Sequence, residues 1–444
     1  MPTERSADLK IKKLLLITSS GGGGLIQTAN AKEQEAYAKY PGLQIIRRDL
    51  LKDWVWKPIG RFFIYFWNNA QRKGSIPAQL LCVYGQFLID LFLHPTVFFY
   101  ALYTLFKEDV DYVIDTQPLC TSAIVKAIKI YNRKRSRKIH LEKVLVDLPT
   151  KKATHFFRAI KKLSPENRRL VRLTTIAPLL DAGETAEEFW QSTCGLSEKA
   201  INLEEVYVRQ AFQRFKNKGR TQEQMTFRIA YKNSEEIQWM RESFERGPIR
   251  AKVGENEVEF TVEPADRMVT ILLGSQPARI ATRSYVEKLA SLAKEYPNTR
   301  IHLFAFCADH MEGKETLLRE VSHFASSIPD YPKNLSIVPF SFQNEAVIAP
   351  LFYRSDATCT RSGGQTAMEL MCVSTGEIWI HSEANEGQDV LKGIPGWEAA
   401  SALYLQKLKG AKIVTPAKVA FHARGLFQRD NRQALANRQI QSMA

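Results

Sequence analysis

The chain has few cysteines, and those it has are not clustered. Its six cysteines are scattered through 444 residues, with no Cys-x-x-Cys pair and no pair of histidines nearby. We therefore expect neither a disulfide framework nor a zinc site. Cysteine usage of this kind fits a protein of a reducing compartment. The first apolar run, Leu14 to Ile17, is too short for a signal peptide. We expect a cytoplasmic protein.

Two common nucleotide-binding signatures are also missing. The run Gly21 to Gly24 lacks the G-x-G-x-x-G spacing of a dinucleotide site and the lysine of a phosphate loop. What the chain has is an excess of positive charge, +15 overall. That excess implies contact with an anionic partner, such as a membrane surface, nucleic acid or a phosphorylated substrate. The hydrophobic content of 45% is that of a globular enzyme or binding protein.

Short apolar stretches alternate with helical patterns, which predicts an α/β fold with parallel sheets. In the first part, the expected strands are residues 12–20, 43–47, 110–115, 144–147 and 170–176. A second series of strands is expected at residues 268–274, 301–306, 335–338, 356–360, 378–381 and 412–414. We therefore expect two Rossmann-like domains, residues 1–265 and 266–415, and a C-terminal helix, residues 416–444, that crosses back to the first domain.

The segment from Trp54 to Phe106 is the most apolar part of the chain, and it mixes aromatic with basic residues. This mixture suits a lipid interface. Its second half is long enough to span a bilayer, but Gln86, Asp90 and Pro95 lie near the middle, and polar groups are costly there. We expect two buried or interfacial helices divided at Pro95, with a pair of core helices as the alternative.

Polar turns follow the expected strands of the first domain. Gly21 to Gly24, Asp115 and Asp147 each stand at a strand end, and in a doubly wound sheet these ends converge on a ligand. The alternatives are a flexible turn for the glycines and turn or capping acids for the two aspartates. The basic run Lys129 to Lys138 is either a solvated helix end or a site for phospholipid head groups or phosphates.

The second domain contains a strand, a glycine turn and a helix in sequence. Arg361-Ser362-Gly363-Gly364 follows a strand, and a helix is expected from Gln365. The first N–H groups of such a helix point outward and form an anion site. Glu369, one turn later, is placed to bind ribose hydroxyls. The alternative is a tight turn that merely needs glycines.

This combination resembles the GT-B glycosyltransferases, and within them the branch of monogalactosyldiacylglycerol synthase and the N-acetylglucosaminyltransferase of the peptidoglycan lipid precursor. Four stretches carry the resemblance. In the first part, SSGGGGLIQTA (19–29) matches an acceptor-side glycine loop and DLPTKKATHF (147–156) an Asp-Leu segment. In the second part, RSGGQTAME (361–369) matches a donor-nucleotide signature and IPGWE (394–398) a segment that binds the donor sugar. Gly274 and Ser275 also match the loop after the first strand of the second domain.

The resemblance implies a GT-B fold, with two Rossmann-like domains facing a cleft and extra helices in the first. It implies a hexosyltransferase that moves a sugar from a nucleotide-diphosphate donor, a UDP-sugar, to a lipid or membrane-associated hydroxyl acceptor. The implied mechanism is inverting and needs no metal or cofactor. Gly274, Ser275 and Arg361 to Gly364 are implied to bind the diphosphate. Glu369 is implied to bind the ribose and Phe340 the base, and the sugar is implied to contact Gln365, Thr366 and Glu398.

The acceptor side departs from the family pattern. Leu25 stands where the family has a histidine, a proposed catalytic base, and Lys152 stands near the position of a second histidine, with His155 three residues on. With the loop histidine missing, Asp147 is our first candidate for the general base and Asp115 the second. His381 has no partner spacing that suggests a ligand, and we interpret it as a structural or surface residue.

Two other functions fit the same observations. A nucleotide-sugar epimerase of GT-B fold would use the same donor site without an acceptor. A non-enzymatic protein that binds membranes or RNA would explain the positive charge, but no RNA-module signature accompanies the basic run, so nucleic acid is not an expected partner. The aromatic segment and the charge together predict peripheral attachment to an anionic membrane.

Overall fold

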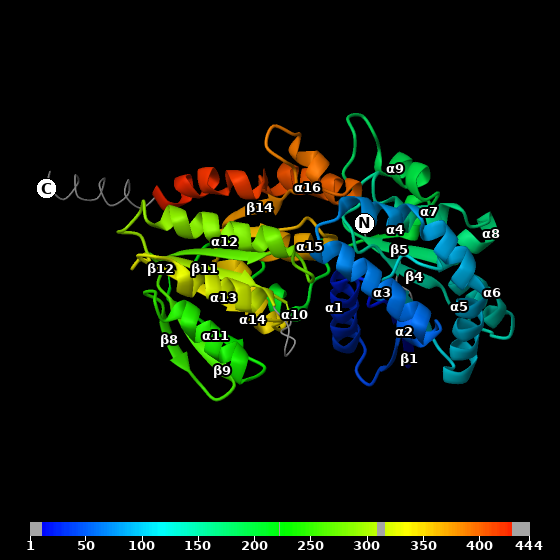
Figure 1. Ribbon diagram of the computed structural model, residues 1–444. Coiled ribbons are helices and arrows are strands. Elements are labelled where there is room, and N and C mark those ends of the chain that lie inside the picture. Colours follow the sequence, from blue (N-terminus) through cyan, green and yellow to red (C-terminus); the bar gives the residue numbers. More distant parts are fainter. Residues whose placement is uncertain (1–10, 222, 309–315, 429–444) are drawn as a thin grey trace, which may run out of the picture. The chain divides into compact units, whose positions relative to one another are not determined.

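The computed structural model describes residues 11–221, 223–308 and 316–428. These residues divide into two compact units. The first unit contains the described residues up to Asn69 and residues Pro77–Gln210, and the second contains Ala70–Ile76 and the described residues from Ala211 on. Each unit contains a six-stranded parallel sheet (Figure 1). The expectation of two Rossmann-like domains is confirmed. Their facing across a cleft stays a prediction.

The first sheet has the strand order β2-β1-β3-β4-β5-β6. Its strands are β1 (Lys13–Thr18), β2 (Gln44–Asp49), β3 (Tyr112–Asp115), β4 (Leu141–Val144), β5 (Val171–Thr175) and β6 (Ile201–Leu203). Leu14 to Ile17 in β1 are almost completely buried, as expected of a central parallel strand covered on both faces. The three strands β1, β3 and β4 are neighbours, so the turns after them lie at one edge of the sheet.

The helices of the first unit include an insertion of four between β2 and β3, which are the expected extra helices. The inserted helices are α2 (Leu50–Asp53), α3 (Lys57–Arg72), α4 (Ile76–Tyr84) and α5 (Gln86–Glu108). The others are α1 (Gly23–Lys39), α6 (Thr121–Arg133), α7 (Thr154–Lys161), α8 (Pro165–Arg168), α9 (Ala186–Thr193), the 3-10 turn η1 (Glu198–Ala200) and, at the unit boundary, α10 (Gln210–Gln213).

The expected division of the apolar segment at Pro95 is wrong, because α5 runs through Pro95 without a break. The break lies instead at Gly85, between α4 and α5. A proline inside a helix costs a hydrogen bond. Leu93, Val97 and Ala101 on the inner face of α5 are almost fully buried, and this packing holds the helix together across the proline.

The second sheet has the order β12-β11-β10-β13-β14-β15. Its strands are β10 (Arg267–Leu272), β11 (Ile301–Phe306), β12 (Leu335–Phe340), β13 (Ala357–Thr360), β14 (Glu377–His381) and β15 (Lys412–Val414). The helices around it are α12 (Arg279–Ala293), α13 (Leu317–Ser327), α14 (Glu345–Arg354), α15 (Gly364–Val373) and α16 (Gly396–Lys409), with the 3-10 turns η2 (Val390–Gly393) and η3 (Pro416–Lys418).

A small antiparallel sheet extends the second unit, and the sequence patterns did not reveal it. Its strands, in the order β7-β9-β8, are β7 (Met225–Ala230), β8 (Arg250–Val253) and β9 (Glu257–Val262), and helix α11 (Ser234–Phe244) lies with them (Figure 1). Phe227 and Phe260 pack edge-on against Phe304 of β11, at centroid distances of 5.8 and 6.0 Å. This packing attaches residues 225–262 to the second unit, which therefore begins before the expected boundary at 266.

The end of the chain is described as far as residue 428. Residues 419–428 are helical, and Val419, Ala423 and Phe427 are buried in the core of the second unit. The helix expected to return to the first domain covers residues 416–444; its described part packs in the second unit, and residues 429–444 lie outside the described residues.

Candidate functional site

In the second unit, two loops meet at the carboxyl end of the sheet because their strands are direct neighbours. β10 pairs with β13, and Leu272 lies opposite Thr360. Gly274 and Arg361 follow these strands, and a Cβ added to Gly274 would lie 3.8 Å from Cδ of Arg361. Gly274 has a φ of +83°, which favours glycine. The sheet thus brings the loop at Gly274 and the turn at Arg361 together.

The turn at Gly363 opens onto the N-terminus of α15. This helix begins at Gly364 and has no side-chain cap, and the first N–H groups of a helix have no partner within the helix. Together with the helix dipole they favour an anion. Gly363 has a φ of −59°, and a Cβ added there would meet nothing within 4 Å. The backbone therefore does not require glycine here, so a need for a tight turn does not explain it.

Glu369 is a buried carboxyl group on α15. Its side chain is 4% exposed, and Gln365, which is 3% exposed, donates from Nε2 to its Oε1 at 3.3 Å. Burial of a carboxylate is costly unless polar groups surround it. A carboxylate accepts hydrogen bonds through two oxygens, so Glu369 can bind two neighbouring hydroxyl groups.

The start of α16 is attached to the same turn. Ser362 donates from Oγ to the main-chain oxygen of Glu398 at 2.6 Å. Arg361 Nε lies 3.5 Å from Oε2 of Glu398, and both side chains are about a tenth exposed. The turn therefore carries a cation and a carboxylate beside the N-terminus of α15. Two further predicted site residues are half-buried: Thr366, which lies in the first turn of α15, and Ser275, which follows Gly274.

The role suggested for Phe340 is not supported. Its ring is completely buried at the end of β12 and packs against Phe306 at a centroid distance of 5.8 Å. Such a ring has no surface left for a nucleotide base. The resemblance placed it by position in the sequence, which does not show on which side of the strand a ring lies.

His381 is structural, as interpreted from the sequence, but it belongs to a polar cluster that the sequence did not reveal. Its Nδ1 lies 3.0 Å from the hydroxyl of Tyr285, which donates to the Val414 carbonyl at 2.8 Å. Its Nε2 lies 3.0 Å from Oε1 of Glu383. Burial raises the pKa of Glu383, but the contact with His381 and the charges of His381 and Arg361 outweigh it, so the pKa is lower than usual.

In the first unit, the glycine loop forms the expected link between a strand and a helix. Gly22 has a φ of +147° and precedes α1, which begins at Gly23. The hydroxyls of Thr18 and Thr116 both donate to the Leu25 carbonyl, at 3.1 and 3.2 Å. Leu25 itself packs against the core of the unit. Leu25 is therefore a structural side chain.

Asp147 and His155 form a pair at the end of β4. Nε2 of His155 lies 2.7 Å from Oδ2 of Asp147, and the side chains are 9% and 14% exposed. β4 ends at Val144, so Asp147 lies in the turn beyond the strand, and His155 is the second residue of α7. The sequence analysis named both residues. The only indication that they form a pair was that a single turn separates Asp147 from the start of the helix that carries His155.

Asp115 is fully buried and does not fit the role of a general base. Nζ of Lys143, also fully buried, lies 2.7 Å from its Oδ2, and the N–H of Gln117 donates to its Oδ1 at 3.1 Å. Burial raises the pKa of Asp115, and the charge of Lys143 opposes this rise. Both oxygens are occupied and out of reach of an acceptor. Asp115 is a structural acid, which was the alternative interpretation.

The outer face of α5 is apolar and exposed. Eight large side chains on it, each between 41% and 67% exposed, are Phe87, Leu88, Leu91, Phe92, Phe99, Tyr100, Tyr103 and Phe106. We call these eight residues the α5 face. α5 is also the one helix in the described ranges that is long and apolar enough to cross a membrane, although 28% of its most apolar stretch is buried. A pair of buried core helices, which was the alternative interpretation, does not describe this exposed face, and interfacial helices stay a prediction.

Basic side chains border the α5 face. Lys107 lies over the ring of Tyr103 at 5.5 Å, and Lys134, from the basic run after α6, lies over that of Phe106 at 5.6 Å. Aromatic and basic side chains in such contact are typical of a lipid interface.

Within residues 11–221, 223–308 and 316–428, no three His, Cys, Asp or Glu side chains are grouped to hold a metal ion.

No family model and no curated protein match the chain. Among solved structures, it is similar to MurG of Acinetobacter baumannii, with 13% identity and a TM-score of 0.47 over 94% of this chain and 92% of that one. It is also similar to the UDP-GlcNAc 2-epimerase of Methanocaldococcus jannaschii, with 12% identity and a TM-score of 0.43 over 94% and 92%. The spinosyn rhamnosyltransferase SpnG, complexed with thymidine diphosphate, gives 10% identity and a TM-score of 0.41 over 96% and 92%. These likenesses are too distant to assign a function.

Proposed function

We propose that the chain is a glycosyltransferase that moves a sugar from a nucleotide-diphosphate donor, a UDP-sugar, to a hydroxyl acceptor. The observation that carries the proposal is the turn before α15: Gly363 leaves open space in front of an uncapped helix N-terminus, and Glu369 is buried one turn further on. An anion and a pair of hydroxyls at that spacing are what a nucleoside diphosphate offers.

The second unit binds the donor in this proposal. The diphosphate contacts the N–H groups of the turn at Gly363 and the loop at Gly274, and Arg361 supplies a positive charge. Glu369 accepts hydrogen bonds from the ribose hydroxyls. The charge of the leaving diphosphate grows as the bond to the sugar breaks, and fixed N–H groups and a cation stabilise it more strongly in that state. No metal ion is needed for this step.

The first unit supplies the base. The acceptor oxygen attacks the anomeric carbon, the bond from that carbon to the diphosphate oxygen breaks, and the proton of the acceptor moves to Asp147. His155 acts as a positioning residue, since its Nε2–H donates to Oδ2 of Asp147 and fixes the orientation of that carboxylate. Oδ1 then remains to accept the proton. A single displacement of this kind inverts the anomeric configuration, as in the branch that the sequence resembles.

We further propose that the enzyme is cytoplasmic and works at an anionic membrane surface, where it meets a lipid-borne acceptor. The α5 face supports this part, because eight exposed apolar side chains bordered by Lys107 and Lys134 suit burial among lipid head groups and acyl chains.

Nucleotide binding tests the proposal most directly. The thermal stability of the full chain is measured with UDP, GDP, dTDP and ADP and with their sugars. A ligand present at 100 times its Kd stabilises the folded state by about 2.7 kcal/mol, and we expect that effect from UDP and UDP-sugars. Conversion of a UDP-sugar without acceptor would instead identify an epimerase. Retention of RNA with no response to any nucleotide diphosphate would indicate a non-enzymatic binding protein.

A further inference from the structure

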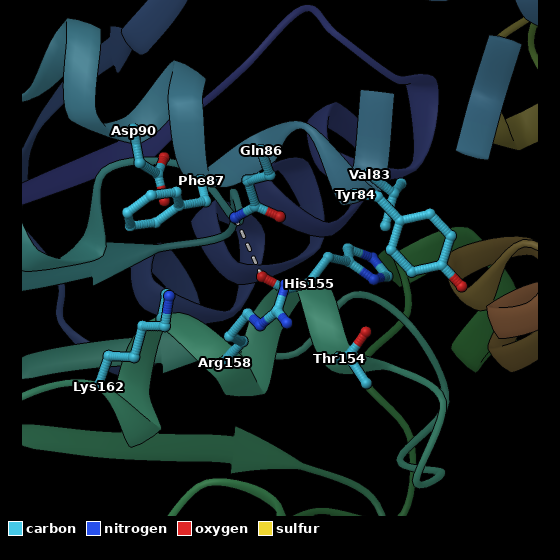
Figure 2. A pocket seen from close by; sticks show the side chains of 10 residues that line it. Val83, Tyr84, Gln86, Phe87, Asp90, Thr154, His155, Arg158 and Lys162 are labelled. Atoms are coloured by element: carbon cyan, nitrogen blue, oxygen red, sulfur yellow. Dashed lines mark hydrogen bonds between the residues drawn. The ribbon is translucent and has the colours of Figure 1, made fainter. Parts of the chain in front are cut away.

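A pocket in the first unit is lined by His155 (Figure 2), whose Nε2 contacts Asp147. It is a small hollow, open to solvent, between the start of α5 and one face of α7. Tyr84 and Phe87 form an apolar wall, and both are exposed by half or more. His155 belongs to the lining, so the pocket reaches the pair that holds the proposed base.

Two cations on α7 and its C-cap line the pocket. Arg158 and Lys162 are four residues apart and therefore project from the same side of the helix. The exposed guanidinium of Arg158 makes no side-chain hydrogen bond or ion pair with any residue that the structure describes. Nζ of Lys162 lies 4.2 Å from the ring centre of Phe87. The positive charge of Arg158 is thus not neutralised by the protein.

The one carboxyl group in the lining is directed elsewhere. Oδ1 of Asp90 accepts the N–H of Cys120 at 2.7 Å. Burial raises the pKa of Asp90, against the opposing effects of that hydrogen bond and of Lys143. The group is therefore neutralised more easily than an ordinary aspartate, and the pocket keeps an excess of positive charge. Tyr84 and His155 are the other titratable groups of the lining.

The shape of the pocket depends on a buried amide. Gln86, 9% exposed, donates from Nε2 to the carbonyl of Pro118 at 2.9 Å and to that of His155 at 3.1 Å. Figure 2 shows the bond to His155. These bonds join the start of α5 to the turn after β3 and to the start of α7. A ligand held by α7 is thereby kept at a defined place relative to Phe87 and the rest of the α5 face.

We propose that this pocket binds the phosphate of an anionic lipid of the membrane that the α5 face contacts. Arg158 binds the phosphate oxygens, which suit a guanidinium, and Lys162 adds a second charge. The acyl chains lie along the α5 face, which continues from Phe87. The contact of the α5 face with a membrane rests on the proposed function, whereas the phosphate site stands on the pocket alone.

The test compares the full chain with Arg158→Gln and with Arg158→Gln/Lys162→Gln. The matched control is Arg169→Gln, which removes an exposed arginine from the same unit outside the pocket. Binding is measured to phosphatidylcholine vesicles with and without 20% phosphatidate. Each cation near a charged membrane contributes roughly a fivefold change in affinity. We expect the double variant to lose about 20-fold on the phosphatidate vesicles and Arg169→Gln to lose less than fivefold.

Other outcomes would overturn the inference. An equal loss for Arg158→Gln and Arg169→Gln would mean that charge is recognised over the whole surface. Competition by millimolar inorganic phosphate as strong as that by soluble dihexanoyl phosphatidate would indicate a free phosphate ligand. Stabilisation by UDP is measured on the same samples and also shows that the variants are folded. Failure of UDP to stabilise the wild type would overturn the proposed function, whereas indifference to phosphatidate would overturn only this inference.

Discussion

Nε2 of His155 lies 2.7 Å from Oδ2 of Asp147, and both side chains are mostly buried. Such a contact orients a carboxylate by a single N–H donor and leaves its other oxygen for a substrate. The first unit thus has a histidine beside an acid although Leu25 occupies the glycine-loop position.

Asp147→Asn should lower kcat/KM by about 10²- to 10⁴-fold, the usual contribution of a general base, and leave UDP binding unchanged. His155→Ala should lower kcat by about tenfold, in the range of a lost hydrogen bond to a charged group. His155→Gln should recover part of this loss, because a glutamine amide can also donate to Asp147. Steady-state transfer kinetics over a range of pH measure each effect.

The control for this set is Asp181→Asn, which removes a largely exposed carboxylate of the same unit and should leave kcat unchanged. Full activity in Asp147→Asn would show that the base lies elsewhere. If His155→Ala lowered only thermal stability, with kcat and its pH profile unchanged, His155 would have no positioning role.

Glu369→Gln should weaken nucleotide binding. Hydrogen bonds to a charged group contribute about 1.5–3 kcal/mol, so the Kd for UDP should rise by roughly 10- to 100-fold, as measured by titration calorimetry. Glu242→Gln, at an exposed position of α11, is the control and should bind like the wild type. An unchanged Kd in Glu369→Gln would remove the central support for the donor site.

Gly363→Ala separates an anion site from a turn that needs glycine. The φ of −59° and the open space around Gly363 predict a free energy of unfolding within about 0.5 kcal/mol of the wild type. UDP affinity should still fall, because the added methyl group occupies the place of the diphosphate. Chemical denaturation and calorimetry on one preparation distinguish the two effects. Undiminished UDP affinity in Gly363→Ala would argue against a diphosphate at this turn.

Gly274→Ala is the contrasting variant. Its φ of +83° is strained for a residue with a Cβ, at a cost of about 1–3 kcal/mol. Here the free energy of unfolding itself should fall. Equal stability of the two alanine variants would contradict the backbone geometry of the two loops.

Acidification should weaken the second unit through Glu383. Its pKa is lower in the folded protein than the ordinary value of 4.5, so the unfolded chain binds the proton more tightly. The stabilisation is therefore present above pH 4.5 and is lost as the pH falls through the folded-state pKa. The difference in unfolding free energy between wild type and Glu383→Gln should shrink below pH 4.5. A difference independent of pH from 3 to 7 would refute this role.

Membrane attachment should depend on the α5 face. Leu91 and Phe92 are 65% and 64% exposed, and burying side chains of this size in an apolar phase contributes about 1.5–3 kcal/mol each. Leu91→Ser/Phe92→Ser should therefore reduce vesicle binding by at least about tenfold, as measured by sedimentation. Leu403→Ser/Leu408→Ser, which changes two exposed leucines of α16, should bind normally. Equal loss in both double variants would contradict a role specific to α5.

Much of the fold follows from local sequence patterns. Apolar runs such as Leu14 to Ile17 predict buried parallel strands because a central strand must be apolar on both faces. The structure has a strand at or next to each expected place; the strand expected at residues 144–147 is shifted, since β4 covers Leu141–Val144. The small sheet of β7, β8 and β9 escaped detection because its strands are not apolar runs: buried residues alternate with more exposed ones in β7 and β9, and β8 is exposed throughout. The site was predictable where it depends on the backbone, as in the glycine turn before α15, since glycine and helix starts are local features.

What the sequence by itself determined is therefore the alternation of strands and helices and the glycine turns that end the strands. Only the tertiary structure decided which acids are available. Lys143 lies opposite Asp115 because β3 and β4 are neighbours, and it occupies that carboxylate. Asp147 lies beyond the end of the strand and meets His155 instead. Exposure of the α5 face was likewise undecided by the sequence, because an apolar helix has the same composition in a core as at a lipid surface, and only packing distinguishes them.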